Sequence, residues 1–449
     1  MANEIGVEQL VDGCRVNRRV YTDREVFELE MDRIFARSWV FLCHEREVAA
    51  PGEVRTIQIG TQPAIVTRDD RGEIQVLMNH CMHRGATLCQ QSHGQARNFR
   101  CWYHGWTYNH RGELIGVPYG EAYGPDFDKS RRGLLKAARV QKYRGMVFAS
   151  LAAEGDELVN YLAGAKRYLD VFMDLSPVGE IEARAGGHKF TYEANWKFQL
   201  ENGVDGYHPN FVHRSFWLMQ PEGAMDIFTE SSPGLTRALG NGHSILDMSP
   251  LVKPPAGNGG LRQDGAPTKS LPSDGLKPKP TGDYFDQLVR AWGRDRTLEI
   301  LEQSNVNLLI FPNLLIIGVQ LRTITPVDVT QTEVYQQPTT LKGVSDAMNV
   351  ARLRTHEAFY GPAALGAPDD LEMFARCSRG MRVRGREWIT FDRGLHRERA
   401  ENGERVGQIT DEVPQRAFYR QWCELMAARA EDAAHAGGNG RTRAPLPAL

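Results

Sequence analysis

The chain has 449 residues, of which 41% are hydrophobic and 24% are charged, and its formal net charge at pH 7 is -2. This length predicts two or three domains with well-formed apolar cores, and the balanced charge argues against nucleic acid and anionic membranes as partners. The first residues lack the basic and apolar regions of a signal peptide, and no run approaches 18 apolar residues. We therefore expect a cytoplasmic protein without a membrane span.

The first third of the chain predicts one helix followed by a small β domain. Residues 24–37 place apolar side chains at helical spacing. From Trp39 onward, short β-branched runs alternate with Gly, Asp and Pro turns, which is typical of antiparallel strands; the runs are 53–59, 64–67, 74–77 and 147–151. We assign residues 1–38 to an N-terminal helical segment of a larger domain, and residues 39–152 to the small β domain.

The rest of the chain mixes helices and strands. Helices are predicted at 157–172, 345–359 (with Ser345 as N-cap) and 418–430, and strands at 189–192, 308–325 and 332–337. Residues 253–282 are rich in Pro and Gly and predict a long loop, either functional as a lid or without fixed structure. We assign residues 153–432 to the larger domain and residues 433–449 to a flexible tail.

Four candidate metal ligands lie in two tight groups within the small β domain. The first group is Cys-x-His and the second, 17 residues later, is Cys-x-x-His; the four residues are Cys81, His83, Cys101 and His104. Because the chain has seven cysteines and no export signal, metal binding is favoured over disulfides. The spacing suits either a Cys₂His₂ zinc site or a Rieske [2Fe–2S] cluster. One cysteine and one histidine in each group favours the Rieske cluster, in which two cysteines hold one iron and two histidines hold the other.

A second candidate site lies in residues 195–216. His208 and His213 would stand roughly 140° apart on an ideal helix, and Pro209 disfavours helical geometry at His208. We therefore expect a broken helix that turns both imidazoles inward. Two histidines and one carboxylate form the facial triad of non-haem Fe(II) oxygenases.

Both segments resemble the large (alpha) subunits of Rieske non-haem iron aromatic ring-hydroxylating dioxygenases. Cys81-Met-His83-Arg-Gly-Ala and Cys101-x-Tyr-His104-Gly-Trp resemble the Rieske motif of that family, and Glu-Asn-x-x-Asp-Gly-Tyr-His-x-x-x-x-His, ending at His213, resembles its iron-binding segment. The resemblance implies a small antiparallel Rieske domain inserted in a catalytic domain with a large antiparallel sheet flanked by helices, an α+β fold.

The same resemblance implies the roles of individual residues. His208 and His213 match the iron ligands, and Asn202 matches a residue close to the iron. Asp205 matches an aspartate that does not bind the iron but bridges to a Rieske histidine of the neighbouring subunit and carries electron transfer. The segment 360–372 resembles the one that supplies the third ligand; its register favours Asp370, while Asp369 and Glu372 remain open. Simple capping of a helix by this acidic group is the other interpretation, and both can hold together, since one aspartate can cap the helix while the next binds the metal.

Residues 21–31, 191–197 and 367–372 resemble most the branch of benzoate, toluate, anthranilate and p-cumate dioxygenases, which mostly oxidise aromatic carboxylates. Such a substrate needs a cationic partner when it is buried, and Arg322 is the candidate, with an ion pair on the sheet surface as the alternative. The expected reaction is cis-dihydroxylation of an aromatic ring by dioxygen in aromatic catabolism. Ring monohydroxylation, as of salicylate, and oxidation of a non-acidic arene are the alternatives.

The resemblance also implies partners. NAD(P)H would supply electrons through a separate reductase, with or without a ferredoxin, and the chain would form a homotrimer or an α₃β₃ assembly with a small β subunit. Two other classes of protein fit less well. A Rieske ferredoxin needs only the first site, and a structural zinc protein needs no second site at all.

Overall fold

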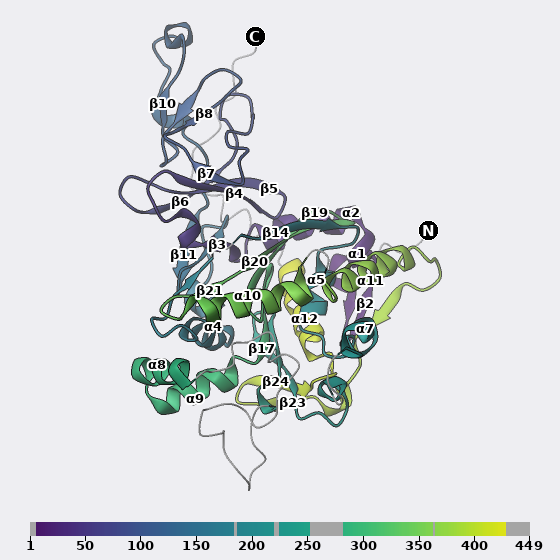
Figure 1. Cartoon of the computed structure of the whole chain (residues 1–449). Helices are drawn as coiled ribbons and strands as arrows, with labels where there is room; N and C mark the ends of the chain where they lie inside the picture. Colours follow the sequence, from purple (N-terminus) through teal and green to yellow (C-terminus); the bar gives the residue numbers. More distant parts are fainter. Residues whose placement is uncertain (1–5, 184–185, 220–223, 252–281, 362–363, 428–449) are drawn as a thin grey trace.

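The computed structural model describes residues 6–183, 186–219, 224–251, 282–361 and 364–427. The predicted tail at 433–449 and the Pro/Gly-rich stretch up to residue 281 lie outside the described residues. The chain forms a broad lower body built around one large sheet, with a narrower unit of small sheets above it (Figure 1).

The large sheet has nine antiparallel strands. Their order is β14 (His188–Tyr192), β20 (Gln331–Pro338), β19 (Gln320–Asp328), β18 (Leu314–Ile317), β17 (Val306–Ile310), β16 (His243–Asp247), β15 (Leu235–Gly240), β24 (Glu404–Gln408) and β23 (Arg399–Glu401). The predicted strands at 189–192 and 332–337 are confirmed, and the predicted 308–325 region is three strands, β17 to β19. Consecutive apolar side chains of β17 face opposite sides, and Leu308 and Leu309 belong to different core clusters. The sheet is therefore covered on both faces.

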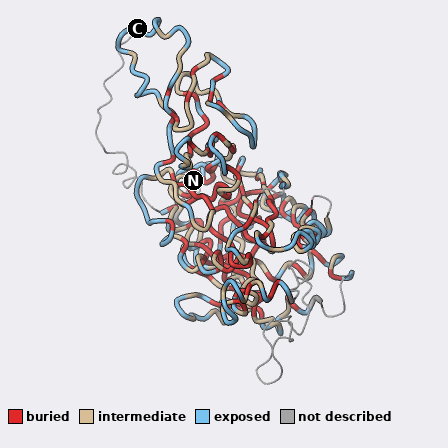
Figure 2. Tube along the Cα trace, turned by 60° about the vertical axis from the view of Figure 1, so that its left-hand side comes forward, coloured by how far each residue is buried: buried red, intermediate tan, exposed pale blue. Residues whose placement is uncertain are grey.

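Helices cover these two faces. They are α1 (Arg19–Thr22), α2 (Arg24–Glu30), α3 (Leu158–Tyr161), α4 (Ala165–Asp174), α5 (Lys197–Gly203), α6 (Pro209–Val212), α7 (Arg214–Trp217), α8 (Gly282–Trp292), α9 (Arg294–Gln303), α10 (Asp346–Tyr360), α11 (Ala367–Gly380) and α12 (Val413–Ala427). In Figure 1, α10 crosses in front of the large sheet, from the side of β21 (Thr340–Leu341) to the side of α5 and α11. Buried residues are concentrated in this lower body, and the upper unit is more exposed (Figure 2).

The upper unit consists of short antiparallel strands. One sheet has the order β6 (Ile74–Met78), β5 (Gln62–Arg68), β4 (Glu53–Ile59) and β7 (His93–Gln95); a second has β10 (Leu114–Gly116), β9 (Thr107–Tyr108) and β8 (Phe99–Arg100). A third sheet has β11 (Arg139–Tyr143), β12 (Met146–Ser150) and β3 (Val40–His44). The small antiparallel β domain expected from the sequence is thus present in the structure.

Two helix predictions need correction. The helix expected at 157–172 is two helices, α3 and α4, because Ala163 between them adopts a left-handed conformation with φ of 43°. The helix expected at 24–37 begins as α2 and continues as a π-helical turn over Met31–Phe35. Ser345 caps α10 as expected, because its side chain accepts a hydrogen bond from the Met348 amide.

A buried ion pair fastens the N-terminal segment to the helix that leads into the second site. Lys197 and Glu30 are fully buried, and Lys197 Nζ donates to Glu30 Oε1 at 2.6 Å. The indole N–H groups of Trp196 and Trp422 donate to the same carboxylate at 2.9 and 2.7 Å. This single carboxylate therefore joins α2, α5 and α12.

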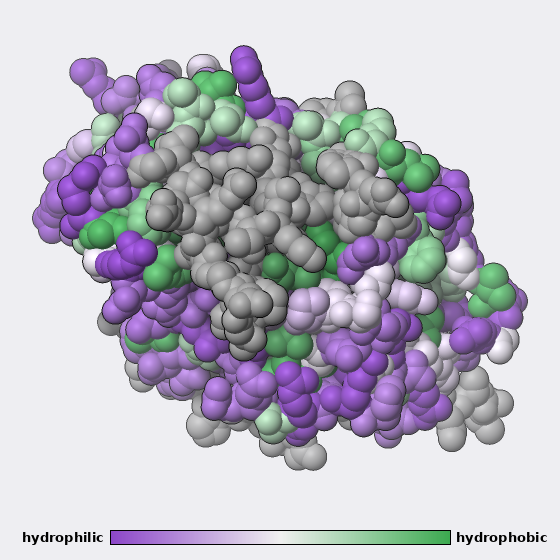
Figure 3. Space-filling view, turned by 60° about the horizontal axis from the view of Figure 1, so that its bottom comes forward, coloured by the Kyte–Doolittle hydropathy of each residue, from purple (hydrophilic) through white to green (hydrophobic). Residues whose placement is uncertain are grey.

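The face at the bottom of the lower body carries mainly hydrophilic side chains among the described residues, with small hydrophobic groups between them (Figure 3). Within the described part of the chain, no helix is both long enough and apolar enough to cross a bilayer.

Candidate metal centres

The first predicted site consists of two loops with the same backbone pattern. In each loop the cysteine amide donates to the carbonyl five residues later, Ala86 or Trp106, and the glycine four residues later donates to the cysteine carbonyl. Gly85 and Gly105 have φ of 78° and 74°, which only glycine adopts without strain. The glycine in each loop allows the backbone to turn with positive φ and close the loop without strain.

These loops bring the two predicted histidines together. The rings of His83 and His104 lie 4.4 Å apart between centroids, and Cys81 and Cys101 are buried beneath them. Nδ1 of each histidine is buried without a hydrogen-bond partner among the described residues. Burial and the neighbouring charges of His104 and Arg84 lower the pKa of His83, which favours the neutral imidazole that a metal requires.

The four side chains fit a two-iron cluster better than a single zinc ion. Ligand atoms of one tetrahedral zinc lie about 3.3–3.8 Å from one another, because each bond is only about 2.0–2.3 Å long. Among the described residues, these two cysteines and two histidines do not form a group of that size. The Tyr108 hydroxyl lies 3.4 Å from Cys81 Sγ, and the His83 ring stacks on Trp106 at 5.0 Å between centroids. The site is thus bordered by a hydroxyl group that contacts the Cys81 sulfur and by the aromatic ring of Trp106.

The second predicted site lies where the helix breaks. After α5, the chain turns at Asp205 and forms two single-turn helices, α6 and α7, that meet at His213. This is the broken helix expected from the spacing, and it turns both imidazoles inward. His208 Nε2 and His213 Nε2 lie 3.6 and 3.3 Å from Asp370 Oδ1 on α11. Within the described residues, His208, His213 and Asp370 are the group whose ligand atoms come close enough to share one metal ion.

The structure separates the three acidic candidates. Asp370 is buried between the histidines, whereas Asp369 lies on the outer side of His213, with 3.8 Å between its Oδ2 and the ring Nδ1. Glu372 faces away and pairs with Arg376 at 2.8 Å. Neither aspartate caps α11 through a side-chain hydrogen bond, because Gly366 is the N-cap, but both lie in the first turn, where a negative charge favours the positive end of the helix dipole.

The electrostatic environment favours a charged carboxylate and a polarised imidazole. Burial alone would raise the Asp370 pKa, but the hydrogen bond from His213 and the charges of His208 and Arg322 hold it below its ordinary value. Burial alone would lower the His208 pKa, but Asp205, 3.4 Å from its Nδ1, raises it. Asn202 Nδ2 lies 3.2 Å from both His208 Nε2 and Asp370 Oδ1, so it borders the space between the ligand atoms.

A cavity of about 110 Å³ adjoins the three ligand atoms and is the natural place for a substrate. Its walls are mainly apolar, and include Phe216, Ile227, Leu246, Ile317 and Phe359. Arg322 lines the same cavity and is only 3% exposed. The alternative of a surface ion pair on the sheet is therefore wrong.

The residues that hold Arg322 were not predicted from the sequence. With its amide oxygen turned to Arg322, Gln336 accepts from Nη2 at 2.9 Å and donates to the Tyr360 carbonyl at 2.9 Å. The guanidinium also lies over the Tyr360 ring, 5.3 Å from its centroid. Once β19 and β20 are paired, Gln336 faces Arg322 directly, but that register requires the tertiary structure.

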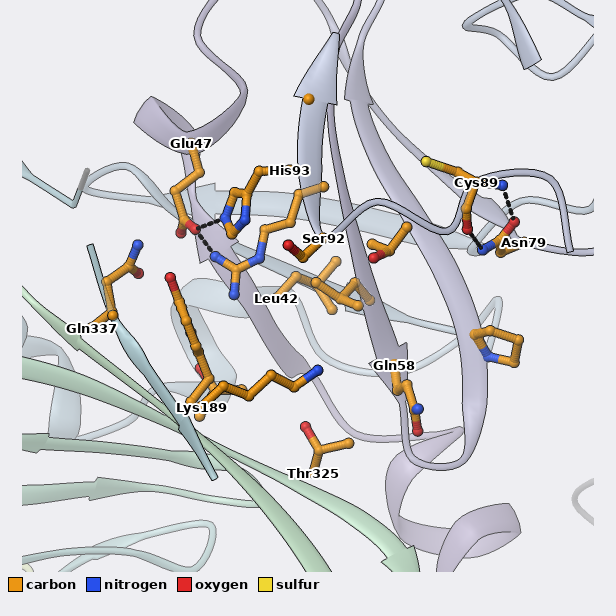
Figure 4. A pocket seen from close by; sticks show the side chains of 18 of the residues that line it. Leu42, Glu47, Gln58, Asn79, Cys89, Ser92, His93, Lys189, Thr325 and Gln337 are labelled. Atoms are coloured by element: carbon orange, nitrogen blue, oxygen red, sulfur yellow. Dashed lines mark hydrogen bonds and ion pairs between the residues drawn. The ribbon is translucent and has the colours of Figure 1, made fainter. Parts of the chain in front are cut away.

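A larger cavity of about 950 Å³ lies elsewhere, between the small sheet of β4 to β7 and the edge of the large sheet (Figure 4). Its charged groups are already paired: Glu47 contacts both Arg55 and His93, and Lys189 pairs with Glu333 at 2.8 Å. Neither histidine of the second site lines it. Its size alone therefore does not make it the reaction site.

Comparison with known proteins agrees with both centres. Residues 38–142 match the Rieske [2Fe-2S] domain family, and residues 172–428 match the catalytic domain of ring-hydroxylating alpha subunits. The large subunit of anthranilate 1,2-dioxygenase from Acinetobacter baylyi is 36% identical over 87% of this chain and 84% of its own length. The large subunit of 2-halobenzoate 1,2-dioxygenase from Burkholderia cepacia is 31% identical over 88% and 83%.

Solved structures agree as well. A naphthalene 1,2-dioxygenase with indole in its active site superposes with a TM-score of 0.79 at 25% identity, over 96% of both chains. These matches confirm the fold class and the family resemblance expected from the sequence. The chain belongs to the large, alpha subunits of the Rieske-type aromatic ring-hydroxylating dioxygenases.

Proposed function

We propose that this chain adds oxygen to the ring of an aromatic carboxylate and that Arg322 binds the carboxylate group. The observation that carries the proposal is the position of Arg322, buried in the wall of the cavity beside His208 and Asp370. Among the described residues, no carboxylate forms an ion pair with this guanidinium; its partners are the amide of Gln336 and the ring of Tyr360. Relatives named for anthranilate, 2-halobenzoate and toluate support an acidic substrate.

The family uses a Rieske cluster and a mononuclear iron, with dioxygen as co-substrate and NAD(P)H acting through a partner reductase. We assign the cluster to Cys81 and Cys101 on one iron and to His83 and His104 on the other. The unpartnered Nδ1 atoms of both histidines support this assignment. When bound, the cluster supplies single electrons and the mononuclear iron supplies a site for activating dioxygen.

His208, His213 and Asp370 are assigned as ligands of the ferrous ion. All three line the cavity, and a ferrous ion held by three protein ligands would keep positions free for substrate and dioxygen. Asn202 lies at the edge of this group and can donate a hydrogen bond toward the open positions.

Arg322 then orients the ring. A planar guanidinium binds a carboxylate through two parallel hydrogen bonds, which fixes both position and rotation of the substrate. The apolar walls of the cavity exclude water and strengthen that attraction. Because Arg322 and the metal ligands line one cavity, the ring of a bound benzoate would face the open side of the iron.

Asp205 is assigned to electron transfer between subunits. It is half-buried, its Oδ2 lies 3.4 Å from His208 Nδ1, and the neighbouring Phe211 is 69% exposed. In one chain the cysteine–histidine loops lie beside β8 in the upper unit, far from α5 and α7 in the lower body (Figure 1). Trp102 and Tyr103 in these loops are 92% and 61% exposed. These features support a homotrimer or α₃β₃ assembly in which the loops of one chain meet Asp205 of the next.

Product analysis tests the proposed reaction. The holoenzyme, supplied with a reductase and NAD(P)H, would be given benzoate, 2-aminobenzoate, 4-methylbenzoate, salicylate, toluene and naphthalene. We expect cis-dihydrodiols from benzoates. A dihydroxybenzoate from salicylate, with no dihydrodiol from any other benzoate, would indicate monohydroxylation. Oxidation of toluene in preference to every carboxylate would contradict the assignment of Arg322.

Two substitutions test the residue roles separately. Arg322→Met should raise KM for benzoate about 100-fold or more, because a charge-assisted bidentate pair is lost, and should leave toluene oxidation unchanged. Asp205→Ala should leave both metal centres filled but uncouple substrate oxidation from cluster oxidation. Normal coupled turnover in Asp205→Ala would contradict that role.

A further inference from the structure

Helix α10 buries polar side chains where an amphipathic helix would place apolar ones. Arg352 and His356 lie one turn apart on its buried face, and both are at most 2% exposed. Nε and Nη2 of Arg352 and both ring nitrogens of His356 have no hydrogen-bond partner among the described residues. No carboxylate of the described chain forms an ion pair with Arg352, and the nearest one to His356, Glu357, lies 3.9 Å away.

The position of these groups follows from the two ends of α10. At its C-terminal end, the Tyr360 carbonyl accepts from Gln336 on β20; near its N-terminal end, Asn349 exchanges two hydrogen bonds with the Leu341 backbone. The extended stretch from residue 336 to 341 and the helical stretch from residue 349 to 360 both span about 16.5 Å, so α10 runs alongside residues 336–341. His356 and Arg352 therefore stand about 6 and 12 Å from the Arg322 end of the helix.

A further unpartnered group lies on the large sheet, at about the level of His356 along α10. Gln320 is fully buried, pairs in register with Pro338, and faces the same side of β19 as Arg322. Neither its amide nitrogen nor its amide oxygen has a partner among the described residues. We call Arg352, His356 and Gln320 the α10 cluster. It offers several N–H donors and no negative charge.

A buried guanidinium without a counter-charge is costly, so an anion that reaches it would be held strongly. Burial lowers the pKa of Arg352 to about 10, which leaves the side chain charged at neutral pH. Burial lowers the pKa of His356 to about 4, so this ring remains a neutral donor or acceptor. The cluster thus carries one positive charge that the described protein does not neutralise.

We propose that the α10 cluster is a second carboxylate-binding site, and that the chain accepts an aromatic ligand with two acidic groups, one at Arg322 and one at Arg352. This inference rests on the proposed role of Arg322 in holding the first carboxylate. The spacing along α10 requires the two acidic groups to lie on the order of 10 Å apart. A two-ring dicarboxylate meets that requirement, and a one-ring dicarboxylate such as terephthalate does not.

The first test needs no substitution. Calorimetry on the oxidised holoenzyme, which cannot turn over without reductant, would compare biphenyl-4,4′-dicarboxylate with biphenyl-4-carboxylate, and terephthalate with benzoate. The long dicarboxylate should bind about tenfold more tightly than its monocarboxylate, because it gains a charged hydrogen bond, while terephthalate should show no such advantage. Equal affinity of the two biphenyl acids would overturn the inference.

The second test separates ligand binding from a structural role. Arg352→Met should abolish the advantage of the long dicarboxylate, leave benzoate affinity within about twofold, and leave the melting temperature of the ligand-free protein equal or higher, because an uncompensated buried charge is removed. Arg354→Met, at an exposed position of the same helix, is the matched control and should change nothing. Lower stability with unchanged dicarboxylate affinity would show that Arg352 is structural, satisfied by internal water.

The outcomes also separate this inference from the proposed function. An enzyme that oxidises benzoates without favouring the long dicarboxylate refutes the α10 site alone. An enzyme that favours the dicarboxylate through Arg352 but oxidises no carboxylate refutes the proposed reaction alone.

Discussion

The buried pair of Lys197 and Glu30 gives the sharpest stability prediction. Lys197→Met keeps an unbranched apolar side chain, one atom shorter, but leaves the Glu30 carboxylate buried with only the two indole donors of Trp196 and Trp422. Breaking one side of a buried ion pair costs about 3–5 kcal/mol, because the remaining charge is uncompensated. We expect a loss of unfolding free energy in that range. Since Lys197 is the first residue of α5, ferrous-ion affinity should fall as well.

Urea denaturation followed by tryptophan fluorescence measures this loss directly, because two tryptophans contact the carboxylate. The double variant Glu30→Gln/Lys197→Met should recover to within about 1–2 kcal/mol of wild type, since no buried charge remains. Lys189→Met, which removes a more exposed pair with Glu333, should cost at most about 1 kcal/mol. A single variant within 1 kcal/mol of wild type, or a double variant no better than the single, would refute the reasoning.

Three further predictions concern the two centres and a buried acid beside them. Asp370→Asn should abolish ferrous-ion binding measured by metal analysis, whereas Asp369→Asn should retain most of it. The reason is that only Asp370 approaches both imidazoles. Equal loss of ferrous ion in the two variants would contradict the assignment of Asp370. Tyr108→Phe should lower the reduction potential of the cluster in voltammetry, because a hydrogen bond to the Cys81 sulfur stabilises the reduced state; an unchanged potential would remove that role. Burial raises the pKa of Glu201 to about 7, so its folded state holds a proton that the unfolded state releases near its ordinary value. The contribution of this proton to stability is present at low pH and is lost as pH rises toward 7. Wild type should therefore lose unfolding free energy relative to Glu201→Gln as pH rises to 7. Parallel plots of unfolding free energy against pH for the two proteins would exclude this contribution.

The sequence predicted local features well where a short-range physical reason existed. Gly85 and Gly105 follow the cysteines at positions where the tight loops have positive φ, so the requirement for glycine there is a local one. Pro209 and the spacing of His208 and His213 indicated a broken helix, which the structure has. In contrast, the left-handed turn at Ala163 was missed, because no glycine, asparagine or proline occupies that position to signal it.

Long-range geometry could not be predicted in the same way. The register of the sequence favoured Asp370 as the third ligand but left Asp369 and Glu372 open, and only the orientation of α11 brings Asp370 to the two imidazoles. Gln336 could not be predicted as a partner of Arg322, because their contact depends on the register of β19 and β20. Arg352 and His356 gave no sequence signal, since charged residues on a helix normally face water.

The sequence by itself determined the family and identified the candidate ligands of both centres, because cysteines and histidines of fixed spacing form a pattern that few other proteins share. The tertiary structure decided which carboxylate joins the histidines, which cation lines the cavity, and which polar groups are buried without partners. These properties depend on the packing of segments far apart in the chain, and a local pattern of residue types carries no information about that packing.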